Sequence, residues 1–258
     1  MKILLFIMFC MCTHKLMAQK TDSLPPQVYN WSSLHAIKEQ SLIRKEIMEG
    51  STTVLSYFEV HSSTLEPGKT PHPAHTHNDR EELIIIKDGQ LKITIRDTAR
   101  IMGPESIAYV MTGDEHRIEN AGNTLATYYV FKYISKLPVN LERAKQNGGS
   151  FMISHDDVPM TKTDRGSRRS FFNKATSQLE KFELHTTALD AGFDSHAPHT
   201  HPEEEIILIL KGNVEMFIAG ALYKAAPGDV VFLPSGILHA LKNTGKGPCE
   251  YFAFQWKN

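Results

Sequence analysis

The chain of 258 residues contains an internal repeat, which constrains the fold more than any other feature of the sequence. Residues 58–65, FEVHSSTL, return 124 positions later as residues 182–189, FELHTTAL. A one-residue deletion then changes the spacing to 123, so that residues 128–131 match residues 251–254. A period of this length is too long for a solenoid and indicates two tandem copies of one domain.

Short strands are predicted within each copy. In the first copy, runs rich in β-branched and aromatic residues cover residues 54–60, 83–86, 91–95, 106–110 and 125–131. Glycine-containing turns such as Asp88-Gly89 separate these runs. Short strands at this spacing favour an all-β sandwich or barrel. One helix is predicted between the copies, at residues 141–146, before Gly148-Gly149.

The first residues are typical of an export signal. Lys2 precedes an apolar run, residues 3–12, that is too short to span a bilayer but suits the core of a signal peptide. We therefore predict a signal peptide at residues 1–18, a first domain at 24–140 and a second at 141–258. The protein would then be periplasmic or secreted. The alternative is a cytosolic protein whose first strand is apolar.

Composition excludes several classes of function. Lysine and arginine number 28 against 29 acidic residues, for a net charge of −1, so no basic surface for nucleic acid is expected. No later stretch is long and apolar enough for a membrane helix, and no membrane contact is expected after signal removal. Removal of Cys10 and Cys12 would leave Cys249 alone, which we interpret as a buried small hydrophobe rather than a nucleophile.

Eight histidine and glutamate residues form the chemically informative pattern. Two histidines separated by one residue on a strand project to the same face. A glutamate begins the next strand, and a distant strand adds a third histidine. Three neutral imidazoles and one carboxylate are a complete ligand set for a first-row divalent metal, with positions left for water or substrate. The predicted ligands are His75, His77, Glu82 and His116 in the first copy and His199, His201, Glu205 and His239 in the second.

These residues resemble the cupin superfamily, whose two motifs the second copy matches almost position by position. The first copy departs in its second motif, where Glu105 stands at the usual glycine and Met111 at the usual proline. The resemblance covers nearly the whole chain after the predicted signal and implies a bicupin of two double-stranded β-helix (jelly-roll) barrels. It implies one metal per domain, and the ligand set leaves Fe, Mn, Zn, Ni, Cu and Co open.

Two further histidines are candidates for acid–base catalysis. His72 and His196 stand three residues before each histidine pair, where they could line the mouth of a pocket. The alternative is a polar contact within a loop.

Charged residues near the motifs allow two interpretations. The arginines could hold a substrate carboxylate or lie on a solvated strand, and they are Arg44, Arg168 and Arg169. Glu203 and Glu204 are expected in a solvated acidic turn, with Glu204 as the only substitute metal ligand.

The sequence therefore predicts a metal-dependent enzyme for a small, oxygen-rich substrate. The pattern permits dioxygenase or decarboxylase chemistry, conversion of a sugar or uronate, and, ranked last, hydrolytic release of ammonia. The alternatives are a periplasmic cupin that binds a metal or small ligand without turnover, and a purely structural scaffold. Association into a homo-oligomer is left open.

Overall fold

The computed structural model describes residues 23–258. The predicted signal peptide, residues 1–18, lies outside the described residues, as do Cys10 and Cys12. In the part of the chain that is described, no helix combines the length and apolar character needed to cross a membrane.

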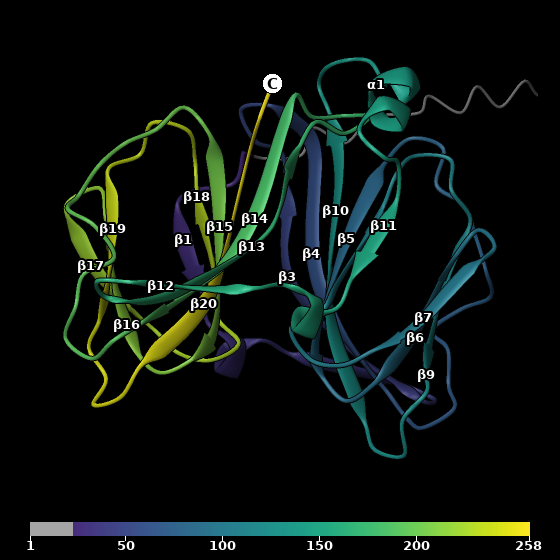
Figure 1. Cartoon of the computed structure of the whole chain (residues 1–258), viewed down its shortest axis with the longest axis horizontal. Coiled ribbons are helices and arrows are strands. Elements are labelled where there is room, and N and C mark those ends of the chain that lie inside the picture. The colour runs from purple at the N-terminus through teal and green to yellow at the C-terminus, as the bar shows by residue number, and fades with distance from the viewer. Residues whose placement is uncertain (1–22) are drawn as a thin grey trace, which may run out of the picture.

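Figure 1 shows two β-rich halves that lie side by side. The first half contains β1 (Gln27–Tyr29), β2 (Ala36–Glu39), β3 (Leu42–Gly50), β4 (Leu55–Leu65), β5 (Glu81–Asp88), β6 (Leu91–Ile95), β7 (Thr98–Met102), β8 (Ile107–Val110), β9 (His116–Asn120) and β10 (Ala126–Ser135). The second half contains β11 (Phe151–Ile153), β12 (Met160–Thr163), β13 (Gly166–Lys174), β14 (Lys181–Leu189), β15 (Glu204–Lys211), β16 (Val214–Ile218), β17 (Ala221–Ala225), β18 (Val230–Leu233), β19 (His239–Asn243) and β20 (Cys249–Lys257).

Helices are few and short. The predicted helix between the copies is confirmed as α1 (Leu141–Gln146), whose Asn140 side chain accepts a hydrogen bond from the backbone N–H of Arg143 and so caps the helix. The two 3-10 helices of the described residues are η1 (Trp31–Ser33) and η2 (His155–Asp157).

Each half pairs a large sheet with a small one. The large sheets have the orders β11-β8-β5-β10-β4-β3-β2 and β1-β18-β15-β20-β14-β13-β12. The small sheets, β7-β6-β9 and β17-β16-β19, lie opposite them (Figure 1). We call the interior between the two sheets of a half its cup, N-terminal or C-terminal. This arrangement confirms the predicted jelly-roll class.

Side-chain alternation gives each large sheet two apolar faces. On β5, Ile84 and Ile86 belong to the core of the N-terminal cup, whereas Leu83 and Ile85 belong to a core shared by both halves. In that shared core Phe131 packs edge-on against Phe254, with ring centroids 4.8 Å apart. The two large sheets therefore pack back to back, and each cup opens away from the interface.

The halves also exchange strands. β1, at the start of the chain, pairs with β18 of the second half, and β11, which follows the linker helix, pairs with β8 of the first half. Each large sheet thus contains one strand from the opposite half of the sequence. The boundary predicted at residue 140 stays a prediction.

A buried glutamate on β5 connects the halves. Glu81 is fully buried and accepts hydrogen bonds from the Tyr109 hydroxyl at 2.5 Å, from Thr176 Oγ1 at 2.7 Å and from the backbone N–H of Ser177 at 2.8 Å. The Ser177 hydroxyl contacts the same carboxylate. Since Thr176 and Ser177 precede β14, this carboxylate anchors the second half to the first.

The equivalent glutamate on β15 makes the reciprocal connection. Glu204 accepts hydrogen bonds from Thr52 Oγ1 at 2.6 Å, from the N–H of Thr53 at 2.6 Å and from Trp256 Nε1 at 2.9 Å. The expected solvated acidic turn is therefore wrong, because Glu203 is 8% exposed and Glu204 is fully buried. Glu204 points into the interface because it precedes Glu205, and successive side chains on a strand point to opposite faces.

The departure from the cupin pattern at Glu105 also has a place in the interface. Glu105 adopts φ of 63°, in the left-handed region where glycine is more usual. Its carboxylate lies 3.3 Å from Lys211 Nζ and 3.4 Å from His155 Nε2, both in the second half. The side chain thus contributes contacts between the halves that a glycine could not make.

Candidate metal centres

The four predicted ligands of the N-terminal cup converge. One ligand atom from each of His75, His77, Glu82 and His116 lies within 4.8 Å of all the others. His75 Nε2 is 3.0 Å from His77 Nε2, and the Glu82 carboxylate lies 3.0 Å from His77 Nε2 and 3.1 Å from His116 Nε2. Such a cluster could hold one metal ion.

The C-terminal cup has a similar but looser arrangement. Ligand atoms of His199, His201 and His239 lie within 4.8 Å of one another. Glu205 Oε2 lies 3.2 Å from both His201 Nε2 and His239 Nε2. The carboxylate therefore borders the histidine cluster without belonging to the tightest set.

Backbone pairing positions the histidines. His75 forms an isolated β-bridge with His116, and His199 forms one with His239. The expectation that each histidine pair lies on a regular strand is wrong, because His77 and His201 lie in irregular chain after the bridge. His201 is held there by its carbonyl, which accepts a hydrogen bond from the N–H of Gly236 at 2.8 Å.

Backbone carbonyls orient the imidazoles. His201 Nδ1 lies 3.0 Å from the carbonyl of Glu203, and His239 Nδ1 lies 2.9 Å from that of Ile237. A carbonyl only accepts, so these rings carry hydrogen on Nδ1, which leaves Nε2, the nitrogen that faces Glu205, as the atom that would bind a metal in place of a proton. This donor set fits a divalent transition metal.

The protonation states of the glutamate and histidine side chains also favour metal binding. Burial raises the pKa of Glu205, but hydrogen bonds with His201 and His239 outweigh it and lower the pKa to about 2. Burial, together with the neighbouring His116, lowers the pKa of His75 to about 4. At neutral pH the cups therefore offer ionised carboxylates, and His75 offers a neutral imidazole, as metal ligands require.

One neighbour of the ligand carboxylate differs between the cups. In the N-terminal cup Lys132 Nζ lies 3.7 Å from Glu82 Oε1. Gln255 occupies the matching position on β20 and donates a hydrogen bond from Nε2 to Glu205 Oε1 at 3.2 Å. The N-terminal centre therefore has an extra positive charge close to its carboxylate.

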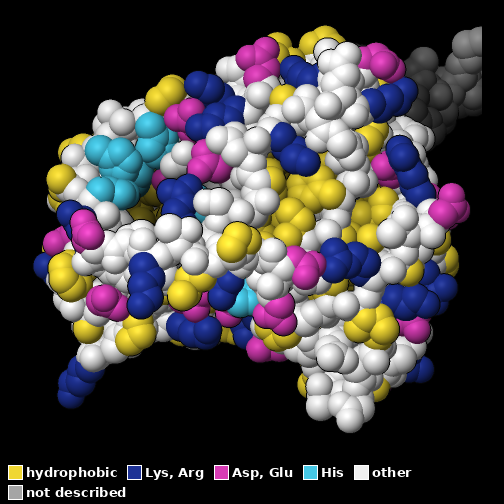
Figure 2. Space-filling view, in the orientation of Figure 1, with side chains coloured by type: hydrophobic (Ala, Val, Ile, Leu, Met, Phe, Trp, Pro, Cys, Tyr) yellow, Lys and Arg dark blue, Asp and Glu magenta, His cyan; other side chains and the backbone are white. Residues whose placement is uncertain are grey.

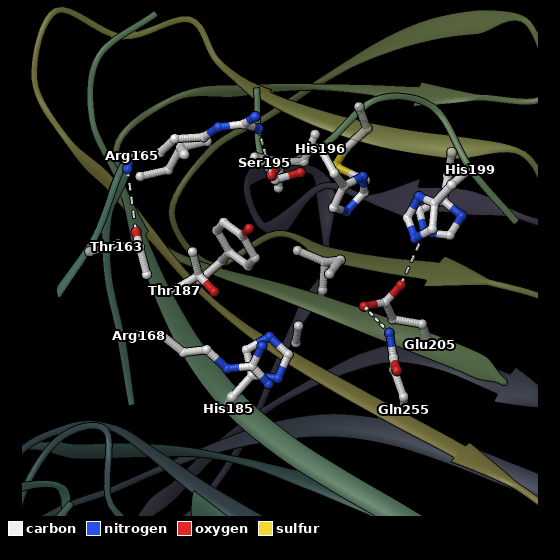
Figure 3. A pocket seen from close by; sticks show the side chains of 18 of the residues that line it. Thr163, Arg165, Arg168, His185, Thr187, Ser195, His196, His199, Glu205 and Gln255 are labelled. Carbon is white, nitrogen blue, oxygen red and sulfur yellow. Dashed lines mark hydrogen bonds and ion pairs between the residues drawn. The ribbon is translucent and has the colours of Figure 1, made fainter. Parts of the chain in front are cut away.

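His199 and His239 of the C-terminal cluster border a cavity of about 460 Å³ (Figure 3). His199, Glu205 and Gln255 line one side of it, and Arg168 and His185 line another. Figure 2 shows imidazole side chains gathered at the surface of this half. The volume is within the range of small-molecule sites.

The two further candidate histidines lie beside the clusters. The His72 and His75 ring centroids are 4.1 Å apart, and those of His196 and His199 are 3.9 Å apart. Both candidate side chains are exposed, and His196 lines the cavity. Partial loss of solvent beside the neighbouring histidines lowers the pKa of His196, which favours a neutral imidazole that can accept a proton.

Sequence reasoning missed His185 and left the three arginines unresolved. His185 lines the cavity, and burial with the nearby Arg168 lowers its pKa to about 4. Arg169 instead contacts the carbonyl of Val158, away from the cavity. The repeat gave a signal that could have found His185, because His61 stands at the matching position.

Cys249 behaves as expected. The thiol is buried, and burial raises its pKa to about 11. It is therefore protonated at neutral pH and unsuited to nucleophilic attack.

Comparison with known proteins identifies the family. A model of the cupin domain matches residues 61–132 and 185–254, more than half of the chain. The chain belongs to the cupin family. The two matches make it a bicupin, and each contains one of the clusters described above.

Several solved bicupin structures are similar in fold. AerE from Microcystis aeruginosa has a TM-score of 0.68 at 16% identity, over 87% of this chain and 97% of that one. Protein Ylba from E. coli has a TM-score of 0.70 at 13% identity, over 94% and 96%. A variant of oxalate decarboxylase from Bacillus subtilis has a TM-score of 0.68 at 15% identity, over 92% and 78%.

A curated relative matches a shorter segment. An uncharacterised protein of Aquifex aeolicus is 36% identical over 53 residues, which are 20% of this chain and 44% of that protein. The match thus spans less than half of the length of that relative.

Proposed function

We propose that this bicupin is an exported, metal-dependent enzyme and that its reaction takes place in the C-terminal cup. The substrate would be a small, oxygen-rich molecule. The reaction would be of the dioxygenase or decarboxylase type, or the conversion of a sugar or uronate.

The observation that carries this proposal is the contact between a histidine cluster and an accessible cavity. His199, His239 and Glu205 line the same cavity of about 460 Å³ as Arg168 and His185. Catalysis needs room for a substrate beside the metal and polar groups that orient it. The oxalate decarboxylase named above has a similar fold at 15% identity, which makes decarboxylation one of the reactions to test.

The residues of the cup have distinct roles in such a reaction. A bound Fe, Mn, Zn, Ni, Cu or Co ion would supply Lewis-acid or, for the redox-active metals, electron-transfer chemistry. His199, His201 and His239 would hold it, with Glu205 as the anionic ligand. His196, exposed beside His199, would accept or donate a proton at the substrate. Ile207 and Met216 line the cavity and would limit the access of water.

Metal content and turnover test this proposal. We expect purified protein without a histidine tag to contain up to two transition-metal ions per chain by elemental analysis. His239→Ala should remove one ion and lower turnover by at least about a thousandfold. The matched change His116→Ala should remove the other ion and retain most of the turnover. Screening would use organic acids, uronates and phenolics, under air and under nitrogen.

The outcome also separates the reaction types. A requirement for oxygen would assign an oxidative reaction, and turnover under nitrogen would assign decarboxylation or isomerisation. Loss of turnover with His116→Ala but not with His239→Ala would contradict the assignment to the C-terminal cup.

The second candidate is a binding protein without turnover. The accessible cavity beside the half-buried histidine cluster favours it, because the same cavity would serve a captured ligand equally well. Saturable affinity without product, unchanged by His196→Gln, would support it. A chain without metal, whose melting temperature is unchanged by His199→Ala and His239→Ala, would indicate a structural scaffold instead.

A further inference from the structure

We propose that the substrate of the C-terminal cup carries a carboxylate, and that Arg168 binds this group at the wall opposite the metal centre. This inference rests on the proposed function, for which it names the substrate class.

The matching arginine of the N-terminal cup, Arg44, is already paired with carboxylates of the protein. Arg44 binds Glu46 through Nε and Nη2, and Nη2 also lies 2.6 Å from Glu59 Oε1. Glu59 further accepts a hydrogen bond from the Tyr57 hydroxyl at 2.7 Å and lies 2.7 Å from His61 Nδ1. Arg44 Nε and Nη2 are thus both paired within the protein.

In the C-terminal cup the same arginine has lost one of its partners. Ser170 stands where the first copy has Glu46, and its side chain is too short to replace the carboxylate. Arg168 keeps a single 2.9 Å hydrogen bond, from Nη2 to Glu183 Oε1. Its Nε is buried without a hydrogen-bond partner among the described residues. A buried donor left unpaired is unfavourable, and a ligand that accepts this hydrogen bond would recover the lost free energy.

The surroundings of this arginine are also more open than in the first copy. The Glu183 side chain is 20% exposed, compared with 9% for Glu59 at the matching position. Ala253 stands in the cavity wall where the first copy has Val130, and it pairs with His185 across the strands β14 and β20. The smaller side chain at this position leaves room for a ligand beside His185.

A neutral histidine completes the anchor. Within residues 23–258, His185 Nδ1 is buried without a hydrogen-bond partner, since Glu183 Oε1 is 3.7 Å away. Figure 3 shows Arg168 and His185 next to each other, across the cavity from His199 and Glu205. A guanidinium binds a carboxylate through paired N–H groups, and an N–H of His185 can donate to the same oxygens. A ligand bound at both walls would have one oxygen-bearing end at the metal and its carboxylate at Arg168.

Calorimetric titration with succinate and succinamate tests the anchor. The two probes have the same length and differ in one carboxylate, which succinamate replaces with an amide. We expect the wild-type protein, with its metal content measured, to bind succinate about ten- to a hundredfold more tightly. Arg168→Met should reduce this preference to within about twofold. Ser170→Glu, at an exposed position, should do the same by giving Arg168 the partner that Arg44 has.

The control is Arg44→Met, the matched change in the N-terminal cup, which should leave the preference unchanged. Equal binding of both probes by the wild-type protein would overturn the inference. A preference that persists in both Arg168→Met and Ser170→Glu would also overturn it. Metal content and turnover are separate readouts, so an active protein that shows no preference for the carboxylate would keep the proposed function and lose only this inference.

Discussion

The two cups have the same ligand types and use the residues around them in opposite ways. In the N-terminal cup, Glu59 and His61 are buried against each other, and Arg44 is paired twice. In the C-terminal cup, the corresponding Glu183 and His185 are partly exposed and border a cavity. Duplication has therefore preserved the candidate metal ligands while the surrounding polar groups became internal contacts in one copy and accessible groups in the other.

This difference suggests different roles for the two cups: metal binding alone in the N-terminal cup, and metal-dependent chemistry in the C-terminal cup. The tighter four-residue cluster lies in the N-terminal cup, where Lys132 also faces the ligand carboxylate. The looser cluster lies beside the cavity. A rigid cluster stabilises a fold, whereas chemistry needs room and unpaired polar groups near the metal. We therefore expect the two halves to respond differently wherever a change touches their polar surroundings.

The largest effect is expected where the two halves should behave alike. Glu81→Ala should lower the free energy of unfolding by about 3–5 kcal/mol, because it leaves the buried donors of Tyr109, Thr176 and Ser177 without their acceptor. Glu204→Ala should have an effect of similar size. Urea denaturation measures both.

Glu142→Ala, at an exposed position of α1, is the control and should change the free energy of unfolding by less than about 0.5 kcal/mol. A change below about 1 kcal/mol for Glu81→Ala would show that the two halves do not depend on this connection.

Much of this architecture was predictable from the repeat. Matching offsets identified eight candidate ligands, and the structure brings them together as two clusters in matching places. The alternation of side chains along a strand also explains why Ile84 and Ile86 of β5 share the core of the N-terminal cup, on the face that carries Glu82. The grouping of these residues was predictable because spacing and alternation are local properties of the chain, whereas their use as metal ligands stays a prediction.

The interface was not predictable in this way. Nothing local in Glu203-Glu204-Glu205 shows that the middle carboxylate receives hydrogen bonds from Thr52 and Thr53, about 150 residues earlier. The exchange of β1 and β11 also depends on how whole sheets meet. Differences between the copies held a usable signal, because Ser170 in place of Glu46 leaves the second copy's arginine without one carboxylate partner.

Exchanging the neighbours of the ligand carboxylates should change metal affinity in opposite directions. Lys132→Gln should strengthen binding of Zn²⁺ in the N-terminal cup by about tenfold or more, because it removes a positive charge 3.7 Å from Glu82. Gln255→Lys should weaken binding in the C-terminal cup by a similar factor. Competition with a chelator measures each site, with His239→Ala or His116→Ala used to silence the other. Equal affinities in all variants would show that this charge does not distinguish the cups.

Narrowing the C-terminal cavity should weaken ligand binding. Ala253→Val gives the cavity wall the side chain that the first copy has at Val130. We expect succinate to bind about tenfold more weakly, with the stability changed by less than about 1 kcal/mol, because the added methyl groups extend into open space. Val130→Ala is the matched control and should leave succinate binding unchanged. Unaltered binding by Ala253→Val would place the ligand elsewhere in the cavity.

The smallest effect concerns pH and His185. Burial and Arg168 lower its pKa to about 4, whereas the unfolded chain has the ordinary value of 6.5. The unfolded state therefore binds more protons between these values, so the stability that the neutral ring contributes is present above pH 6.5 and is lost as the pH falls towards 4. Between pH 7 and pH 5.5, His185→Gln should remove about 1 kcal/mol of this loss, measured by urea denaturation. His35→Gln, at an exposed position, should leave the pH dependence as it is. If His185→Gln also left the pH dependence unchanged, His185 would titrate in the folded protein at the ordinary imidazole pKa. Its ring would then become charged beside Arg168 as the pH falls below that value.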